Sequence, residues 1–196
     1  MRANEIFEGK WWEFGDTMTL YHGTSDQMLD KISKEGLKAP INAVDYAIEV
    51  LKDYEDQINL KKMTELVKQD VGGYRGFEPG EKSKSVYFHL DFDRAAQYAE
   101  AYAEHGGEIA YQVFNIVKRY AAVQMPRWVN AKPVVLIVEV PYDWVNHYGH
   151  DFKTIYQNVT KSGSVNTKEL DDISTHIEAR IERDIPPSMI KKIMEV

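Results

Sequence analysis

Two tyrosines, Tyr87 and Tyr98, stand on either side of a short turn between a predicted strand and a predicted helix. Tyr87 lies in the segment 85–89, where apolar and polar residues alternate as in a strand with one buried side. Tyr98 lies in an alanine-rich run that extends to Ala103 and favours a helix. Two aromatic rings held on rigid elements can grip a flat ring from both sides, although burial in a core is the commoner role of tyrosine.

Two further polar residues fall on predicted strands. His22 lies in the predicted strand 18–23, on its apolar face. Glu178 lies near the start of the alternating segment 177–185, where apolar residues face inward and Glu182 shares the outer face with it. Each residue also has an ordinary interpretation: a core histidine satisfied by the backbone, and a solvated charge on an edge strand.

The elements that must position these residues follow from periodicity. Helical patterns cover 43–71 and 108–123, and a loop rich in glycine, lysine and glutamate covers 72–84. The run 133–141 is almost continuously apolar, which is typical of a central strand covered on both faces. Residues 1–17, with a tryptophan pair, are expected to form an N-terminal arm folded onto the body.

The remaining segments carry weaker signals. Residues 142–170 hold turn residues and aromatics without a clear period, and 188–194 is expected to form a last helical turn or two. No linker argues for a second domain, so 1–196 is predicted to be one domain. Strands and helices do not alternate, and we therefore expect an α+β fold with a largely antiparallel core.

The composition narrows the classes of function. The chain of 196 residues has no cysteine, which excludes disulfides, zinc–thiolate sites and a cysteine nucleophile. No apolar run is long enough to cross a bilayer, and the N-terminus is not of the secretory type. We therefore expect no membrane contact and a cytoplasmic location. Delivery of the protein into a target cell stays open. The net charge of −7 argues against a passive nucleic-acid coat.

Three separated segments, taken in order, resemble the ADP-ribosyltransferase family of the diphtheria-toxin and poly(ADP-ribose) polymerase type. The signature of that family is a His, a Tyr and a Glu on three successive core strands, in a split, largely antiparallel core. The matching segments are Tyr21-His22-Gly23-Thr24, Val86-Tyr87-Phe88 with the helix that carries Tyr98, and Glu178-Ala179-Arg180-Ile181 followed by Ile185-Pro186-Pro187. With the strand 133–141, the resemblance covers about half the chain, and the two helical regions are additions to the minimal family fold.

The resemblance implies an NAD site. His22 would hydrogen-bond a ribose hydroxyl, and the backbone of Gly23, with Thr24 beside it, would hold the nicotinamide carboxamide. Tyr87 and Tyr98 would sandwich the nicotinamide ring. NAD would be a co-substrate, and no metal is implied.

The resemblance also implies a catalytic carboxylate, and Glu178 matches the family pattern better than Glu182 does. The family often has a small polar residue where this chain has Ala95, which puts one carboxamide contact in doubt. Glu178, His22 and Tyr87 would together form the catalytic set. A carboxylate facing the cleft would supply the fixed negative charge that an oxocarbenium-like sugar requires.

The expected function is that of an effector-like, NAD-dependent mono-ADP-ribosyltransferase, a glycosyltransferase that modifies a macromolecule. The acidic balance favours a protein acceptor over a nucleic acid. One alternative is an RNA 2′-phosphotransferase, which looks like a relative of the same fold but relies on arginine and histidine and lacks the strand glutamate. The others are an NAD glycohydrolase, with water as acceptor, and a binding module that has lost turnover.

Overall fold

The computed structural model describes seven stretches of the chain. They are residues 15–39, 43–72, 85–105, 108–121, 131–147, 150–160 and 176–196. The tryptophan pair of the expected arm and nearly all of the predicted loop 72–84 lie outside these residues. Within them, no helix is long and apolar enough to cross a membrane.

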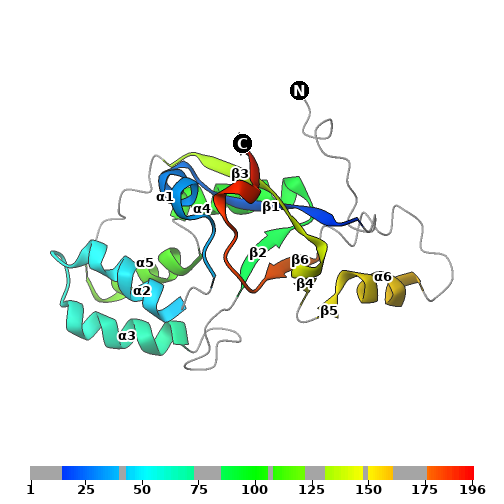
Figure 1. Cartoon of the computed structure of the whole chain (residues 1–196). Helices are drawn as coiled ribbons and strands as arrows, with labels where there is room; N and C mark the ends of the chain where they lie inside the picture. Colours follow the sequence, from blue (N-terminus) through cyan, green and yellow to red (C-terminus); the bar gives the residue numbers. More distant parts are fainter. Residues whose placement is uncertain are drawn as a thin grey trace.

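The strands form one seven-stranded antiparallel sheet, in the order β5-β4-β6-β2-β1-β3-β7, and six α-helices accompany it in the described stretches (Figure 1). This confirms the α+β class. The strands are β1 Thr17–Ser25, β2 Val86–His89, β3 Pro133–Pro141, β4 Asn146–His147, β5 His150–Asp151, β6 Glu178–Ile181 and β7 Ile190–Glu195. The helices are α1 Leu29–Glu35, α2 Ala43–Leu51, α3 Leu60–Gly72, α4 Phe92–His105, α5 Glu108–Tyr120 and α6 Phe152–Thr160.

The longest ladder joins β1 to β3, from Thr17↔Pro141 to Ser25↔Pro133. The bounds of β3 are those predicted from its apolar run, and Leu136 and Val138 on this strand are fully buried. Val135 and Ile137, which face the opposite side, are buried as well, so both faces of β3 are covered, but the strand lies next to the edge of the sheet, with only β7 beyond it. The prediction of a covered strand is confirmed, and its placement at the centre is wrong.

The C-terminal segment corrects two predictions. The helical turns expected over 188–194 are replaced by a single 3-10 turn, Pro187–Met189, and then by β7. A strand forms there because the free side of β3 offers backbone partners that a local pattern cannot reveal. The strand predicted over 177–185 ends at Ile181, and Ile185 instead forms an isolated bridge with Leu37.

The two faces of the sheet are covered differently. On one face, the fully buried residues Leu20, Phe88 and Ile181 belong to the main hydrophobic cluster, which also takes in Ile32 of α1 and Phe152 of α6. The helix α6 and the short strands β4 and β5 fall within residues 142–170, where the sequence has no clear hydrophobic period. On the other face, α4 packs on β1 and β3 through small side chains.

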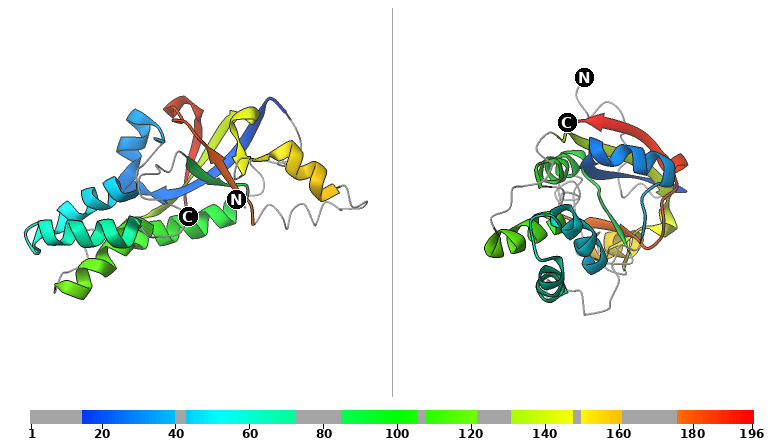
Figure 2. Two further views of the ribbon diagram at one scale, coloured as in Figure 1. Left: turned by 90° about the horizontal axis from the view of Figure 1, so that it is seen from below. Right: turned by 90° about the vertical axis from the view of Figure 1, so that its left-hand side faces the viewer.

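The helices α2, α3 and α5 have a hydrophobic cluster of their own. Its fully buried members include Leu51, Val67, Val113 and Val117. Both views of Figure 2 show these three helices grouped together to one side of the sheet. The two predicted helical regions are confirmed, with the first divided between α2 and α3 by a 3-10 turn, Lys52–Tyr54.

Candidate functional site

The register between β2 and β6 brings four polar side chains to one face of the sheet. Tyr87 pairs with Arg180, and His89 pairs with Glu178. Because alternate residues of a strand face opposite sides, these four residues share a face, and the residues between them are buried in the main cluster on the other. Tyr87 and Glu178, two of the predicted catalytic residues, therefore lie on neighbouring strands on the same side.

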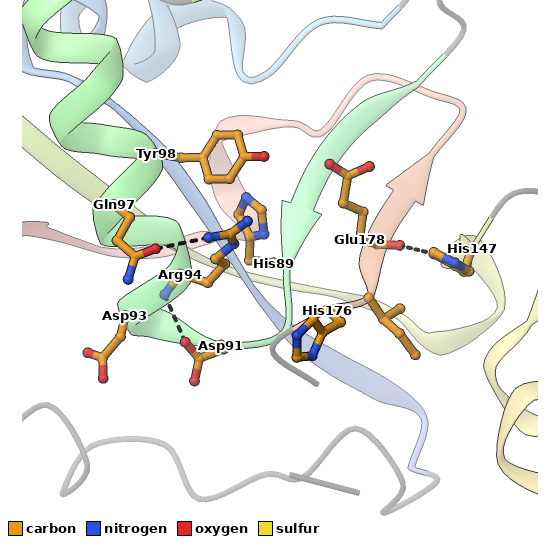
Figure 3. A pocket seen from close by; sticks show the side chains of 10 residues that line it. His89, Asp91, Asp93, Arg94, Gln97, Tyr98, His147, His176 and Glu178 are labelled. Carbon is orange, nitrogen blue, oxygen red and sulfur yellow. Dashed lines mark hydrogen bonds between the residues drawn. The ribbon is translucent and has the colours of Figure 1, made fainter. Parts of the chain in front are cut away.

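A cavity of about 620 Å³ opens on this face, within the size range of small-molecule sites. Its walls come from the end of β2, the first turns of α4, the strand β4 and the start of β6 (Figure 3). Most of the lining side chains are polar or charged, as a nucleotide-like ligand would need. They are His89, Asp91, Asp93, Arg94, Gln97, Tyr98, His147, His176, Ile177 and Glu178.

The helix α4 begins at Phe92, because Asp91 caps it. The carboxylate of Asp91 accepts a hydrogen bond of 2.8 Å from the backbone N–H of Arg94. Arg94 donates a second bond, of 3.0 Å, to the side-chain oxygen of Gln97. This first turn of α4 is thus held in place beside the cavity, and it fixes where Tyr98 stands one turn further on.

The two tyrosines have different ring partners in the structure. Tyr98 stacks on His89, with ring centroids 4.4 Å apart and planes tilted by 36° (Figure 3). The guanidinium of Arg94 lies 5.4 Å from the centroid of the same ring. Tyr87 has the guanidinium of Arg180 over it at 4.8 Å. Both tyrosines are more than a third exposed, so part of each ring is open to solvent. Whether they sandwich a nicotinamide ring stays a prediction.

His89 belongs to this site, although the sequence analysis left it out of the candidate set. Its side chain is 9% exposed, and burial, with the nearby charge of Arg94, lowers its pKa from 6.5 to about 4. The imidazole is therefore neutral at ordinary pH and serves Tyr98 as a flat stacking partner. Its alternation with Tyr87 along β2 was the signal in the sequence that pointed to it.

His22 lies at the junction of β1 and β2 and is not among the residues described as lining the cavity. Its Nδ1–H donates a 2.8 Å hydrogen bond to the carbonyl oxygen of Tyr87, and its ring tilts against Phe88 on the core face. Because a carbonyl oxygen can only accept, Nδ1 carries the proton. Burial lowers the pKa of His22, so the ring is neutral and its Nε2 is an acceptor.

Gly23 and Thr24 lie where β1 meets α4 and β3. A Cβ atom added to Gly23 would lie 2.2 Å from the carbonyl oxygen of Ala95, so glycine is required for the close approach of α4. Thr24 is 2% exposed and pairs with Val134 of β3. Ala95 is fully buried at this contact, which gives its small size a packing reason. The carboxamide contact assigned to Gly23 stays a prediction.

Glu178 lines the cavity together with two other carboxylates, Asp91 and Asp93, and it is the one of the three that lies on a strand of the sheet. Its side chain forms an ion pair of 3.7 Å with Arg180 of the same strand. Its carbonyl oxygen accepts a 2.7 Å hydrogen bond from Nδ1–H of His147. Glu182, the competing candidate, is exposed and comes after the end of β6. The geometry therefore favours Glu178 over Glu182.

His147, His176 and Arg94 are cavity residues that sequence reasoning did not find. Arg94 follows the capping aspartate and reads as an ordinary surface charge, and the two histidines stand in segments without a period. Only the pairing of β4 with β6 brings His147 to Glu178. The described residues hold no group of three or more histidines and carboxylates that could bind a metal ion.

Comparisons with known protein families, with curated proteins and with solved structures find no match to this chain.

Proposed function

We propose that this protein is an NAD-dependent mono-ADP-ribosyltransferase with Glu178 as its catalytic carboxylate. The observation that carries the proposal is the register of β2 and β6, which sets Tyr87 and Glu178 on one face beside a polar cavity. His22 on the next strand bonds to the Tyr87 carbonyl, so the three residues of the family resemblance lie on the three neighbouring strands β1, β2 and β6.

The chemistry needs little more than position and charge. When the bond from nicotinamide to ribose breaks, its electron pair goes to the cationic ring nitrogen and nicotinamide leaves neutral, so no acid is required. The ribose becomes oxocarbenium-like and needs a fixed negative charge nearby, which Glu178 supplies. The acceptor then bonds to the same ribose carbon and gives up a proton, which the Glu178 carboxylate could accept as a general base.

Arg180 has a defined part in this scheme. Its guanidinium pairs with Glu178 at 3.7 Å and lies over the Tyr87 ring at 4.8 Å. The pairing limits where the Glu178 carboxylate can point. The cation–π contact restrains the Tyr87 ring. One arginine thus orders both residues that would face the nicotinamide riboside.

The test is nicotinamide release from NAD and transfer of labelled ADP-ribose in cell lysate, followed by protease or nuclease digestion to identify the acceptor. Glu178→Gln keeps the shape of the side chain and removes its charge, and we expect it to slow both reactions by about 10²–10³-fold. Glu182→Gln is the matched control, since it makes the same change on an exposed residue of the same segment, and it should retain wild-type rates. Equal rates for wild type and Glu178→Gln would refute the proposal.

One observation favours a second candidate, the RNA 2′-phosphotransferase. The cavity holds Arg94 together with the side chains of His89, His147 and His176, and arginine with histidine is the combination that could hold a 2′-phosphate. Against it, Glu178 lines the same cavity and would repel a phosphate. Transfer of phosphate from a 2′-phosphorylated RNA to NAD, undiminished in Glu178→Gln, would establish this candidate instead.

A further inference from the structure

Two histidines make the same hydrogen bond at two different places in the sheet. His22 donates Nδ1–H to the carbonyl oxygen of Tyr87 at 2.8 Å. His147 donates Nδ1–H to the carbonyl oxygen of Glu178 at 2.7 Å. The two carbonyls belong to the two residues that share the cavity face, on β2 and on β6.

The backbone setting of the two bonds is also the same. β1 and β2 are joined by the single pair Tyr21↔His89, and the histidine follows Tyr21. Among the described residues, β4 and β6 are joined by one pair, Asn146↔Arg180, and the histidine follows Asn146. In each case the accepting carbonyl lies two residues before the partner on the other strand.

A continued antiparallel ladder would satisfy these carbonyls with a backbone N–H two residues beyond the last pair. In both places the imidazole donates to the carbonyl beside the last described pair; beyond Asn146 and His147, residues 148–149 lie outside the described stretches. A side-chain donor lets the strands separate without leaving the carbonyl unsatisfied. Each bond therefore restrains the main chain at the residue that accepts it, Tyr87 or Glu178.

We propose that His147 is a positioning residue that holds the main chain at Glu178 and so aims its carboxylate into the cavity. This inference rests on the proposed function and extends it to a residue that no sequence pattern indicates. His147 acts through Nδ1–H, on the carbonyl side of β6, and Arg180 restrains the carboxylate from the other side. Figure 3 shows the bond on the main chain of Glu178, away from its carboxylate.

The test separates the two nitrogens of the ring. The side-chain N–H of asparagine can take the place of Nδ1–H, whereas that of glutamine corresponds to Nε2. We expect His147→Ala and His147→Gln to lower kcat for nicotinamide release by about 10²-fold, with KM for NAD unchanged, because a carboxylate displaced by about 1 Å loses that much rate. His147→Asn should restore kcat. His150→Ala, an exposed histidine of β5 outside the cavity lining, is the matched control.

Other outcomes overturn the inference. An active glutamine variant with an inactive asparagine variant would mean that Nε2 contacts the substrate. A lowered melting temperature with unchanged kcat in His147→Ala would mean that the bond serves stability alone.

Failure of the proposed function is told apart by a readout that needs no turnover. In ¹⁵N-labelled protein, the His147 ring should show a protonated Nδ1, and the carbonyl ¹³C shift of Glu178 should change in His147→Ala and not in His147→Asn. If these signals appear and wild type releases no nicotinamide, the positioning bond stands and the transferase assignment falls. If the ring is instead protonated on Nε2 alone, the positioning inference is refuted whatever the activity.

Discussion

Replacement of Gly23 by alanine tests the contact on which the whole site is built. The added Cβ would lie 2.2 Å from the carbonyl oxygen of Ala95 and 2.7 Å from the backbone nitrogen of Ala99, and both atoms belong to the main chain of α4. Real Cβ atoms essentially never come closer than 3.0 Å, so the helix must move outward by 3.0 − 2.2 = 0.8 Å or more. No rotamer change can relieve the clash, because it involves backbone atoms only.

The expected cost is at the upper end for overpacking, about 3 kcal/mol. For a chain of this length, that corresponds to a melting temperature lowered by about 6–12 °C. The shift of α4 also carries Tyr98, next to Ala99, away from the 4.4 Å stack with His89. We therefore expect Gly23→Ala to lose nicotinamide release even at temperatures where it remains folded.

Urea and thermal unfolding followed by circular dichroism measure this cost. Gly15→Ala is the matched control, because a Cβ there would meet nothing closer than 3.7 Å, an ordinary contact. It should unfold within about 0.5 kcal/mol of wild type. If Gly23→Ala lowers the free energy of unfolding as little as Gly15→Ala does, α4 lies farther from β1 than in the structure. The position of Tyr98 on α4 would then be wrong as well.

Two further predictions concern the pH dependence of stability and the helical group. The pKa of His89 is lowered to about 4 in the folded protein, so as the pH falls below 6.5 the unfolded chain takes up a proton before the folded protein does, and the free energy of unfolding decreases by at most about 1.4 kcal/mol per pH unit. His89→Gln should flatten this part of the curve of unfolding free energy against pH. An unchanged slope would contradict the lowered pKa of His89. Leu51→Ala removes a fully buried side chain from the cluster of α2, α3 and α5 and should cost about 2–5 kcal/mol there. Amide hydrogen exchange should become faster in α2, α3 and α5 and stay slow in β3. An equal loss of protection in these helices and in β3 would show that the two hydrophobic clusters unfold as one unit.

The sequence predicted the strands that carry their own pattern. The alternation around Tyr87, the apolar run of β3 and the outward charges near Glu178 each report the burial of a single strand. The α4 N-cap was also predictable, because capping is a local bond between Asp91 and the first turn. The two added helical regions were found for the same reason, since their apolar stripes are periodic.

The elements that were missed depend on partners far along the chain. β7 is a strand because β3 leaves a side free, and its own residues were compatible with a helical turn. His147 reaches Glu178 only through the pairing of β4 with β6 across an interval of 31 residues. Similarly, the sequence placed Tyr87 and Tyr98 near each other but could not show that His89 would be the ring stacked on Tyr98.

The side of the sheet that His22 faces limits how a ligand could contact its ring. Its ring meets Phe88 on the core side, while Tyr87 and Glu178 point to the cavity side. A ribose hydroxyl could therefore meet His22 only at Nε2, and only where β1 and β2 separate beyond the pair Tyr21↔His89.

That junction also divides the site between two parts of the sheet. Tyr98 is carried by α4, which packs on β1 and β3, whereas Tyr87 and Glu178 are carried by β2 and β6. The bond from His22 to the Tyr87 carbonyl ties the first part to the second at the point where the backbone ladder stops. A ligand in the cavity would touch both parts, so its affinity must depend on how rigidly that bond sets their separation. His22 thus adds a side-chain link between the two walls beside the backbone pair Tyr21↔His89, a role that does not depend on its Nε2 meeting the ribose.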